Sequence, residues 1–167
     1  MAVAIRPEQP GDEPAIHDLV RRAFAPMPFS GGDEQDLVDA LRVQGDLVLS
    51  LVAVLPDGTI VGHAGFSPVT IDGAACGWFQ LAPVAAAPGL QRQGIGSALI
   101  RQGIAMLADR GAAGIGVVGN PAYYERFGFR VVPGLAPASA HDEPYFRALV
   151  LRGPAPAGTV RYAPAFG

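Results

Sequence analysis

The stretch Gln91-Arg92-Gln93-Gly94-Ile95-Gly96-Ser97 decides the fold class, because it lies between a predicted strand and a predicted helix. The first N–H groups of a helix have no helical partners, and the helix dipole adds partial positive charge at that end. Gly94 and Gly96 allow a pyrophosphate to approach the backbone without a Cβ clash, and Arg92 adds a full charge. The stretch therefore predicts a phosphate-binding helix start. The competing interpretation is a glycine-rich helix start selected for tight packing.

Strands and helices alternate on both sides of this stretch. Turn signals at 56–58 and 72–73 predict that three successive strands form an antiparallel meander. We expect strands at 2–6, 47–55, 59–69, 78–84, 115–118 and 128–132, with strand-like pieces at 147–151 and 158–162. We expect helices from an N-cap at Asp12 to Phe24, around 37–41, at 94–109 and at 121–127, and a Pro/Ala-rich loop at 133–144. The pattern predicts one α/β (α+β) domain, residues 1–167, with a mixed, mostly antiparallel sheet of about seven strands and about four helices.

Composition excludes several classes of protein. All 12 basic residues are Arg, so no Walker A lysine or Schiff-base lysine is available. The net charge of −3 with scattered basic residues argues against nucleic-acid binding, and no apolar run approaches the roughly 20 residues that span a membrane. The N-terminus lacks a secretory pattern, so a cytoplasmic location is expected. Cys76 is the only cysteine and is expected to be half-buried; three dispersed histidines predict no metal site.

A second glycine pattern, Gly114-Ile-Gly116-Val-Val-Gly119, matches the dinucleotide-binding fingerprint G-x-G-x-x-G. The fingerprint must follow a strand and open a helix, whereas these glycines lie within a strand-like run that precedes Asn-Pro. We therefore interpret them as positions of close packing.

Two segments resemble motifs of the GNAT (GCN5-related N-acetyltransferase) superfamily. Residues 84–100 are similar to its acetyl-CoA motif, whose core is Q/R-x-x-G-x-G/A, through Gln91, Gly94 and Gly96. Residues 120–129 resemble its Asn…Tyr-x-x-x-Gly-Phe segment. The opening 5–7, the strand at 61–63 and the tail 158–166 extend the resemblance over the whole chain, to a YhbS-like bacterial branch without an assigned substrate.

The resemblance implies an acetyl-CoA-dependent N-acetyltransferase, in which a primary amine attacks the thioester directly in a ternary complex. It also implies a sheet that splays between its fourth and fifth strands, where the pantetheine arm pairs with the fourth strand and a backbone N–H near Ala85 or Ala86 stabilises the oxyanion. The cofactor-binding residues that it implies are Leu81, Val84, Ala85, Ala86, Gln91, Arg92, Gln93, Gly94, Ile95, Gly96, Ser97, Asn120, Tyr123, Tyr124 and Arg126.

The same resemblance aligns Tyr124 with the general-acid tyrosine of the family, with Tyr123 as its immediate rival. The general base stays open between Glu34 and His63. The expected acceptor is a small-molecule or peptide amine, and a homodimer is possible in this family. Two alternatives remain: a non-catalytic acyl-CoA sensor or partner-binding module, and a protein that binds a different phosphate ligand.

Overall fold

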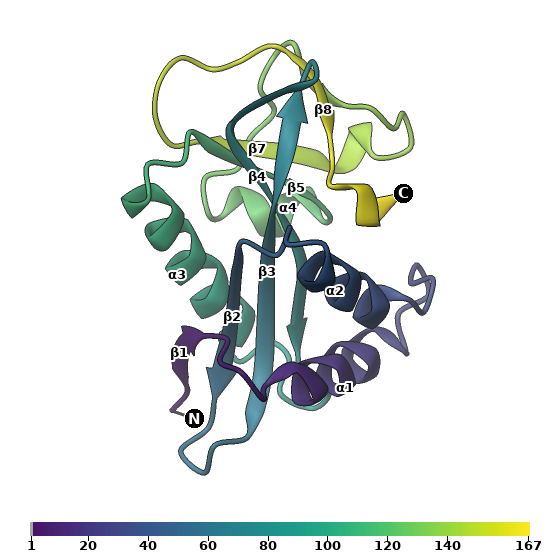
Figure 1. Ribbon diagram of the computed structural model, residues 1–167, viewed down its shortest axis with the longest axis vertical. Helices are drawn as coiled ribbons and strands as arrows, with labels where there is room; N and C mark the ends of the chain where they lie inside the picture. Colours follow the sequence, from purple (N-terminus) through teal and green to yellow (C-terminus); the bar gives the residue numbers. More distant parts are fainter. Residues whose placement is uncertain (1) are drawn as a thin grey trace. The chain divides into compact units, whose positions relative to one another are not determined.

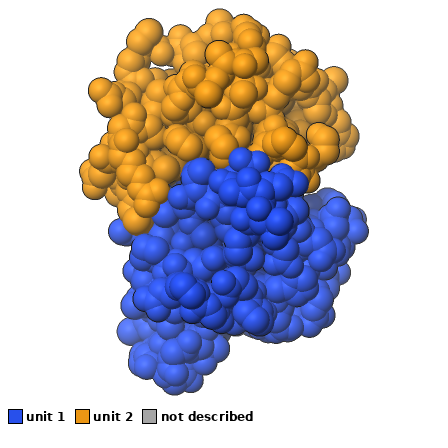
Figure 2. All heavy atoms as spheres, in the orientation of Figure 1, with its two compact units in different colours: residues 1–66, 83–103 blue, residues 67–82, 104–167 orange. Residues whose placement is uncertain are grey.

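The computed structural model describes residues 2–167, which group into two compact units. Unit 1 comprises residues 1–66 and 83–103, and unit 2 comprises residues 67–82 and 104–167 (Figure 2). That the whole chain is a single domain stays a prediction. No helix within residues 2–167 is long and apolar enough to cross a membrane.

Eight strands of the described chain join one mixed sheet, in the order β1-β2-β3-β4-β5-β7, with β8 paired to both β3 and β6 (Figure 1). The elements are β1 Ala4–Pro7, α1 Glu13–Phe24, α2 Glu34–Val43, β2 Leu49–Val54, β3 Ile60–Ile71, β4 Ala74–Ala86, α3 Ile95–Asp109, β5 Gly114–Val118, α4 Pro121–Glu125, β6 Leu135–Pro137, β7 Phe146–Val150 and β8 Gly158–Arg161. The pairs β4·β5 and β6·β8 are parallel, whereas β1·β2, β2·β3, β3·β8 and β5·β7 are antiparallel. The predicted mixed, mostly antiparallel α/β fold is confirmed.

In unit 1, helices cover both faces of the strands (Figure 1). Helices α1 and α2 form one core cluster with β2 and β4; its members are Ile16, Val20, Ala23, Val38, Val52 and Ala85. Helix α3 packs on the opposite face against β3. A Cβ at Gly62 would lie 2.6 Å from Ile95 Cγ2, so only glycine admits this approach of helix and strand. The first turn of α3 is thus positioned by packing.

In unit 2, the glycines of the rejected fingerprint make room for aromatic rings. A Cβ at Gly114 would lie 2.3 Å from the Trp78 ring, and one at Gly116 would lie 2.9 Å from the Phe146 ring. A Cβ at Gly119 would lie 2.7 Å from the Tyr124 ring. Gly114 and Gly116 lie within β5 itself. The interpretation as close packing is therefore confirmed, with side-chain rings as the groups that pack.

Local predictions failed where long-range pairing or a side-chain partner decided the structure. The expected strand at 128–132 is only an isolated pairing of Arg130 with Ala148, because Gly128 has a φ of 98° and Pro133 lacks an N–H. The expected loop at 133–144 contains β6, which pairs with β8.

Two side chains also differ from expectation. Asp12 stands at the N-cap of α1, but its carboxylate accepts hydrogen bonds from Arg6 (2.7 Å) and the Gln9 N–H (2.8 Å) instead of capping the helix. Cys76, expected to be half-buried, is exposed, because β4 begins outside the packed part of the sheet.

Candidate functional site

The loop from β4 to α3 carries the stretch of unit 1 that was predicted to bind phosphate. The Ala87 N–H donates to the Val61 carbonyl at 2.9 Å, which ties the start of the loop to β3. Arg92 has a φ of 66°, in the left-handed region that non-glycine residues rarely adopt, at a cost of about 1–2 kcal/mol. Such strain is typical of functional loops. Gly94 follows with a φ of 83° and turns the chain into the helix.

The first turn of α3 presents free N–H groups. The Gly94 carbonyl accepts the first helical hydrogen bond, from Ala98 at 3.0 Å, so the N–H groups of Ile95, Gly96 and Ser97 precede the helical ladder. Residues 91–94 are exposed, and the first turn of the helix contains no acidic residue that would compete with an anion. The backbone, the dipole and Arg92 therefore fit a pyrophosphate.

Strand β4 changes its pattern where its pairing with β5 stops. The parallel register covers Trp78–Gln80 against Gly114–Gly116, whereas β4 continues to Ala86. Gln80 and Leu81 are both buried, so the alternation of buried side chains shifts by one residue, as at a β-bulge. The splay predicted between β4 and β5 is thus present in the register.

The four β4 residues singled out from the sequence alternate beyond this shift. Leu81 and Ala85 are buried, whereas Val84 and Ala86 are half-buried. Ala85 belongs to the core cluster of unit 1, so its side chain is committed to packing and its backbone is the part that can serve a ligand.

Helix α4 of unit 2 positions Tyr124. The Asn120 Oδ1 accepts from the Ala122 N–H at 3.1 Å and caps the helix, and the Tyr124 N–H donates to the Asn120 carbonyl at 3.2 Å. The Tyr124 ring meets the Phe129 ring edge-on at 6.0 Å. Burial, with a smaller contribution from Tyr123, raises the pKa of Tyr124 to about 12, so its hydroxyl keeps its proton at neutral pH.

Tyr123 and Arg126, also predicted at the cofactor site, contact each other on α4. The Arg126 guanidinium lies 4.6 Å from the Tyr123 ring centroid, and its Nε donates to the Tyr123 carbonyl at 3.3 Å. This contact occupies one face of the Tyr123 ring, whereas the ring of Tyr124 packs against Gly119 and Phe129.

His63 is completely buried in β3 and belongs to a polar network. Its Nε2 lies 2.9 Å from Ser50 Oγ, and that hydroxyl donates to Glu8 Oε1 at 2.8 Å. Since the Ser50 proton points to Glu8, His63 Nε2 is the donor, and Nδ1 is left as a buried acceptor without a partner among residues 2–167. Burial lowers the pKa of His63 to about 4, so the ring is neutral at pH 7.

The anchor of this network is Glu8. It receives two hydrogen bonds from Arg42, at 2.8 and 3.0 Å. Burial alone would raise the pKa of Glu8, but the hydrogen bonds from Arg42 and Ser50 bring it below its usual value. No sequence pattern indicated Glu8, Arg42 and Ser50, because no local pattern connects positions so far apart in the chain.

Glu34, the other predicted base, is the first residue of α2 and is half-buried. Its Oε1 accepts from Ser30 Oγ at 2.6 Å, and Ser30 Oγ accepts from the Gly32 N–H at 2.9 Å. The carboxylate is therefore held by its own loop and keeps access to solvent. His63, in contrast, is enclosed.

Among the residues that the structure describes, His17, Asp36 and Asp39 of unit 1 form a group of possible metal ligands, although the sequence predicted none. One ligand atom from each lies within 4.8 Å of the others, and His17 Nδ1 lies 2.7 Å from Asp39 Oδ2. Arg42 also donates to Asp39 at 3.2 Å, and this cation competes with a metal ion.

The fold is a mixed α/β sheet in which β4 leads through a loop containing Gly94 into α3, and the first N–H groups of α3 have no helical partners. The chain belongs to the acetyltransferase (GNAT) family, whose model matches residues 14–129.

Close relatives agree with this assignment. The chain is 38% identical over 138 residues to the uncharacterized N-acetyltransferase YhbS of Escherichia coli (strain K12), covering 83% of this chain and 76% of YhbS. A GNAT family acetyltransferase from Brucella melitensis, crystallised with acetyl-CoA, is 41% identical with a TM-score of 0.88, covering 99% of both chains. Escherichia coli YhbS in complex with CoA is 34% identical with a TM-score of 0.91, covering 98% of this chain and 91% of that one.

Proposed function

We propose that this protein transfers the acetyl group of acetyl-CoA to a primary amine of a small-molecule or peptide acceptor, by direct attack in a ternary complex. The observation that carries the proposal is the start of α3, where Arg92 and three N–H groups stand without a competing carboxylate. The relatives crystallised with acetyl-CoA and with CoA support it.

In this proposal, acetyl-CoA supplies an activated thioester, and the chain supplies its binding and orientation. The N–H groups of 95–97 and the Arg92 guanidinium bind the pyrophosphate, with Gln91 and Gln93 at the exposed edge of the loop. The backbone of Val84–Ala86 pairs with the pantetheine arm. An N–H at Ala85 or Ala86 donates to the oxyanion, a contact typically worth about 3 kcal/mol.

We assign Tyr124 as the donor to the leaving sulfur. Its pKa of about 12 exceeds the value of about 8.5 for a thiol by about 3.5 units, so complete proton transfer would be uphill by about 5 kcal/mol. A hydrogen bond from the Tyr124 hydroxyl to the developing thiolate stabilises it without that cost. The raised pKa keeps this donor protonated throughout the neutral range.

We assign Glu34 as the group that accepts the proton of the acceptor ammonium, directly or through water. It is a carboxylate at a solvent-accessible helix start, whereas His63 is fully buried with Nε2 committed to Ser50. A base has to reach the proton that it removes. Enclosure of His63 therefore favours Glu34 of the two residues left open by the sequence.

The test is an amine panel with acetyl-CoA, with free thiol as the readout and acetyl-CoA affinity measured separately. We expect Tyr124→Phe to lower turnover about 10²-fold or more with affinity changed less than about threefold. Tyr145→Phe, at an exposed tyrosine, is the matched control. Glu34→Gln should lower turnover most at low pH, where the free amine is scarce. Tight binding of acetyl-CoA without transfer to any amine would instead support a non-catalytic acyl-CoA sensor.

A further inference from the structure

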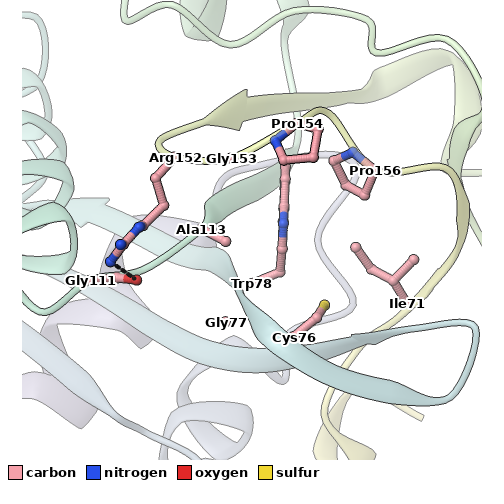
Figure 3. A pocket seen from close by; sticks show the side chains of 10 residues that line it. All are labelled: Ile71, Cys76, Gly77, Trp78, Gly111, Ala113, Arg152, Gly153, Pro154 and Pro156. Carbon is pink, nitrogen blue, oxygen red and sulfur yellow. Dashed lines mark hydrogen bonds between the residues drawn. The ribbon is translucent and has the colours of Figure 1, made fainter.

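Unit 2 contains a cavity of about 490 Å³ that none of the predicted cofactor-binding or catalytic residues lines (Figure 3). Its walls are largely apolar and include Ile71, Trp78, Ala113 and Pro156, with Cys76 and Arg152 among the polar lining residues. The volume lies within the range of about 300–1,000 Å³ that is usual for small-molecule sites.

Arg152 is an exposed residue that brings a positive charge to the edge of this cavity. Its Nη1 lies 3.5 Å from the Gly111 carbonyl, and a Cβ at Gly111 would come within 3.1 Å of the same atom. In Figure 3 the Arg152 side chain extends to Gly111, which also lines the cavity. Among residues 2–167, no Asp or Glu forms an ion pair with Arg152, in contrast to Arg42 and Arg147.

Trp78 adds a second donor. The side chain is only 4% exposed, and its indole is seen edge-on in Figure 3 with the nitrogen at the visible edge. Among the ten residues drawn, the hydrogen bond present joins Arg152 to Gly111, and none reaches the indole nitrogen. The indole N–H is a donor only, so it can offer a hydrogen bond to an acceptor on a bound molecule.

We propose that this cavity binds a small apolar monocarboxylate, such as an aromatic or branched aliphatic acid. The carboxylate accepts hydrogen bonds from Arg152, and the apolar body lies against Trp78, Ala113 and Pro156. An ionised acceptor suits a guanidinium better than a neutral one does, and the apolar walls favour a hydrophobic body over a bare anion. The choice of a carboxylic acid follows from this combination of one cation with apolar walls.

The chain carries two reporters for the test, because Trp78 is its only tryptophan and Cys76 its only cysteine. We expect 3-phenylpropionate to change the intrinsic fluorescence of Trp78 with a Kd of about 1 mM or below, and to slow the reaction of Cys76 with a thiol reagent. The uncharged amide of the same acid should bind at least about tenfold more weakly, and so should inorganic phosphate.

Arg152→Gln should weaken binding of the acid at least about tenfold, whereas Arg161→Gln should leave it unchanged. Any of four results would overturn the proposal. They are the absence of saturable binding in both the Trp78 and the Cys76 readouts, equal binding of the acid and its amide, equal binding of the acid and phosphate, and wild-type affinity for the acid in Arg152→Gln. Neither readout uses acetyl-CoA, so failure here and failure of the proposed transferase activity are distinguishable.

Discussion

Acidification should destabilise the protein through His63, the fully buried histidine of β3. Its pKa is about 4 in the folded protein and about 6.5 in an unfolded chain, so the unfolded state takes up the proton first. The buried, neutral ring of His63 therefore costs the folded state nothing above about pH 6.5. As the pH falls from 6.5 towards 4, the folded state loses stability relative to the unfolded state, whose histidine is protonated. At 1.36 kcal/mol per pKa unit, the difference of about 2.5 units amounts to about 3 kcal/mol, of which about 2 kcal/mol is lost between pH 7 and pH 5.

Urea denaturation at pH 7, 6 and 5 measures this loss. His63→Gln removes the titrating group and keeps an N–H that can reach Ser50, so its unfolding free energy should lack this dependence on pH. His141→Gln, at a side chain that is 90% exposed, should retain it. Glu8 does not interfere, because its pKa is lowered in the folded protein and its contribution to stability is therefore lost only as the pH falls below about 4.5.

An equal loss of stability in wild type and His63→Gln between pH 7 and pH 5 would refute the reasoning. If His63→Gln does not fold, the pH titration of the His63 ring resonances in the wild-type protein, followed by NMR, tests the same reasoning. They should not titrate above pH 5, and a midpoint near 6.5 would show a solvated ring. Such a result would also restore His63 as a candidate base in place of Glu34.

Three glycine-related changes follow from the packing around the candidate site. Gly119→Ala should lower turnover about tenfold or more with little effect on acetyl-CoA affinity, because its Cβ would lie 2.7 Å from the Tyr124 ring and displace it. Wild-type kinetics in this variant would show that turnover does not depend on the position of that ring. Arg92→Gly should have a free energy of unfolding about 1 kcal/mol higher than that of Arg92→Ala, because only glycine adopts the φ of 66° without strain. Calorimetry should find that both variants bind CoA more weakly than the wild type. Gly62→Ala should cost about 1–3 kcal/mol in urea denaturation, because its Cβ would lie 2.6 Å from Ile95; a smaller loss would mean that the start of α3 shifts freely.

The sequence by itself determined the features that depend on neighbouring residues. The glycines and Arg92 of the loop at 91–97 predicted a phosphate-binding helix start, because the free N–H groups of a first turn are a property of the local backbone. The periodicity of apolar residues likewise predicted α1 and α3, and turn residues predicted the meander of β2, β3 and β4. The resemblance to the GNAT superfamily was carried by these same local motifs.

Only the tertiary structure decided the features that join distant positions. Whether residues 128–132 or 135–137 form a strand depends on which partner offers free backbone groups, and β8 pairs with the latter. The hydrogen bonds from Arg42 through Glu8 and Ser50 to His63 join helix α2, the segment after β1, and strands β2 and β3 of unit 1. Burial at the end of that network lowers the pKa of His63, and burial depends on what the rest of the chain places around a side chain, which no local pattern records.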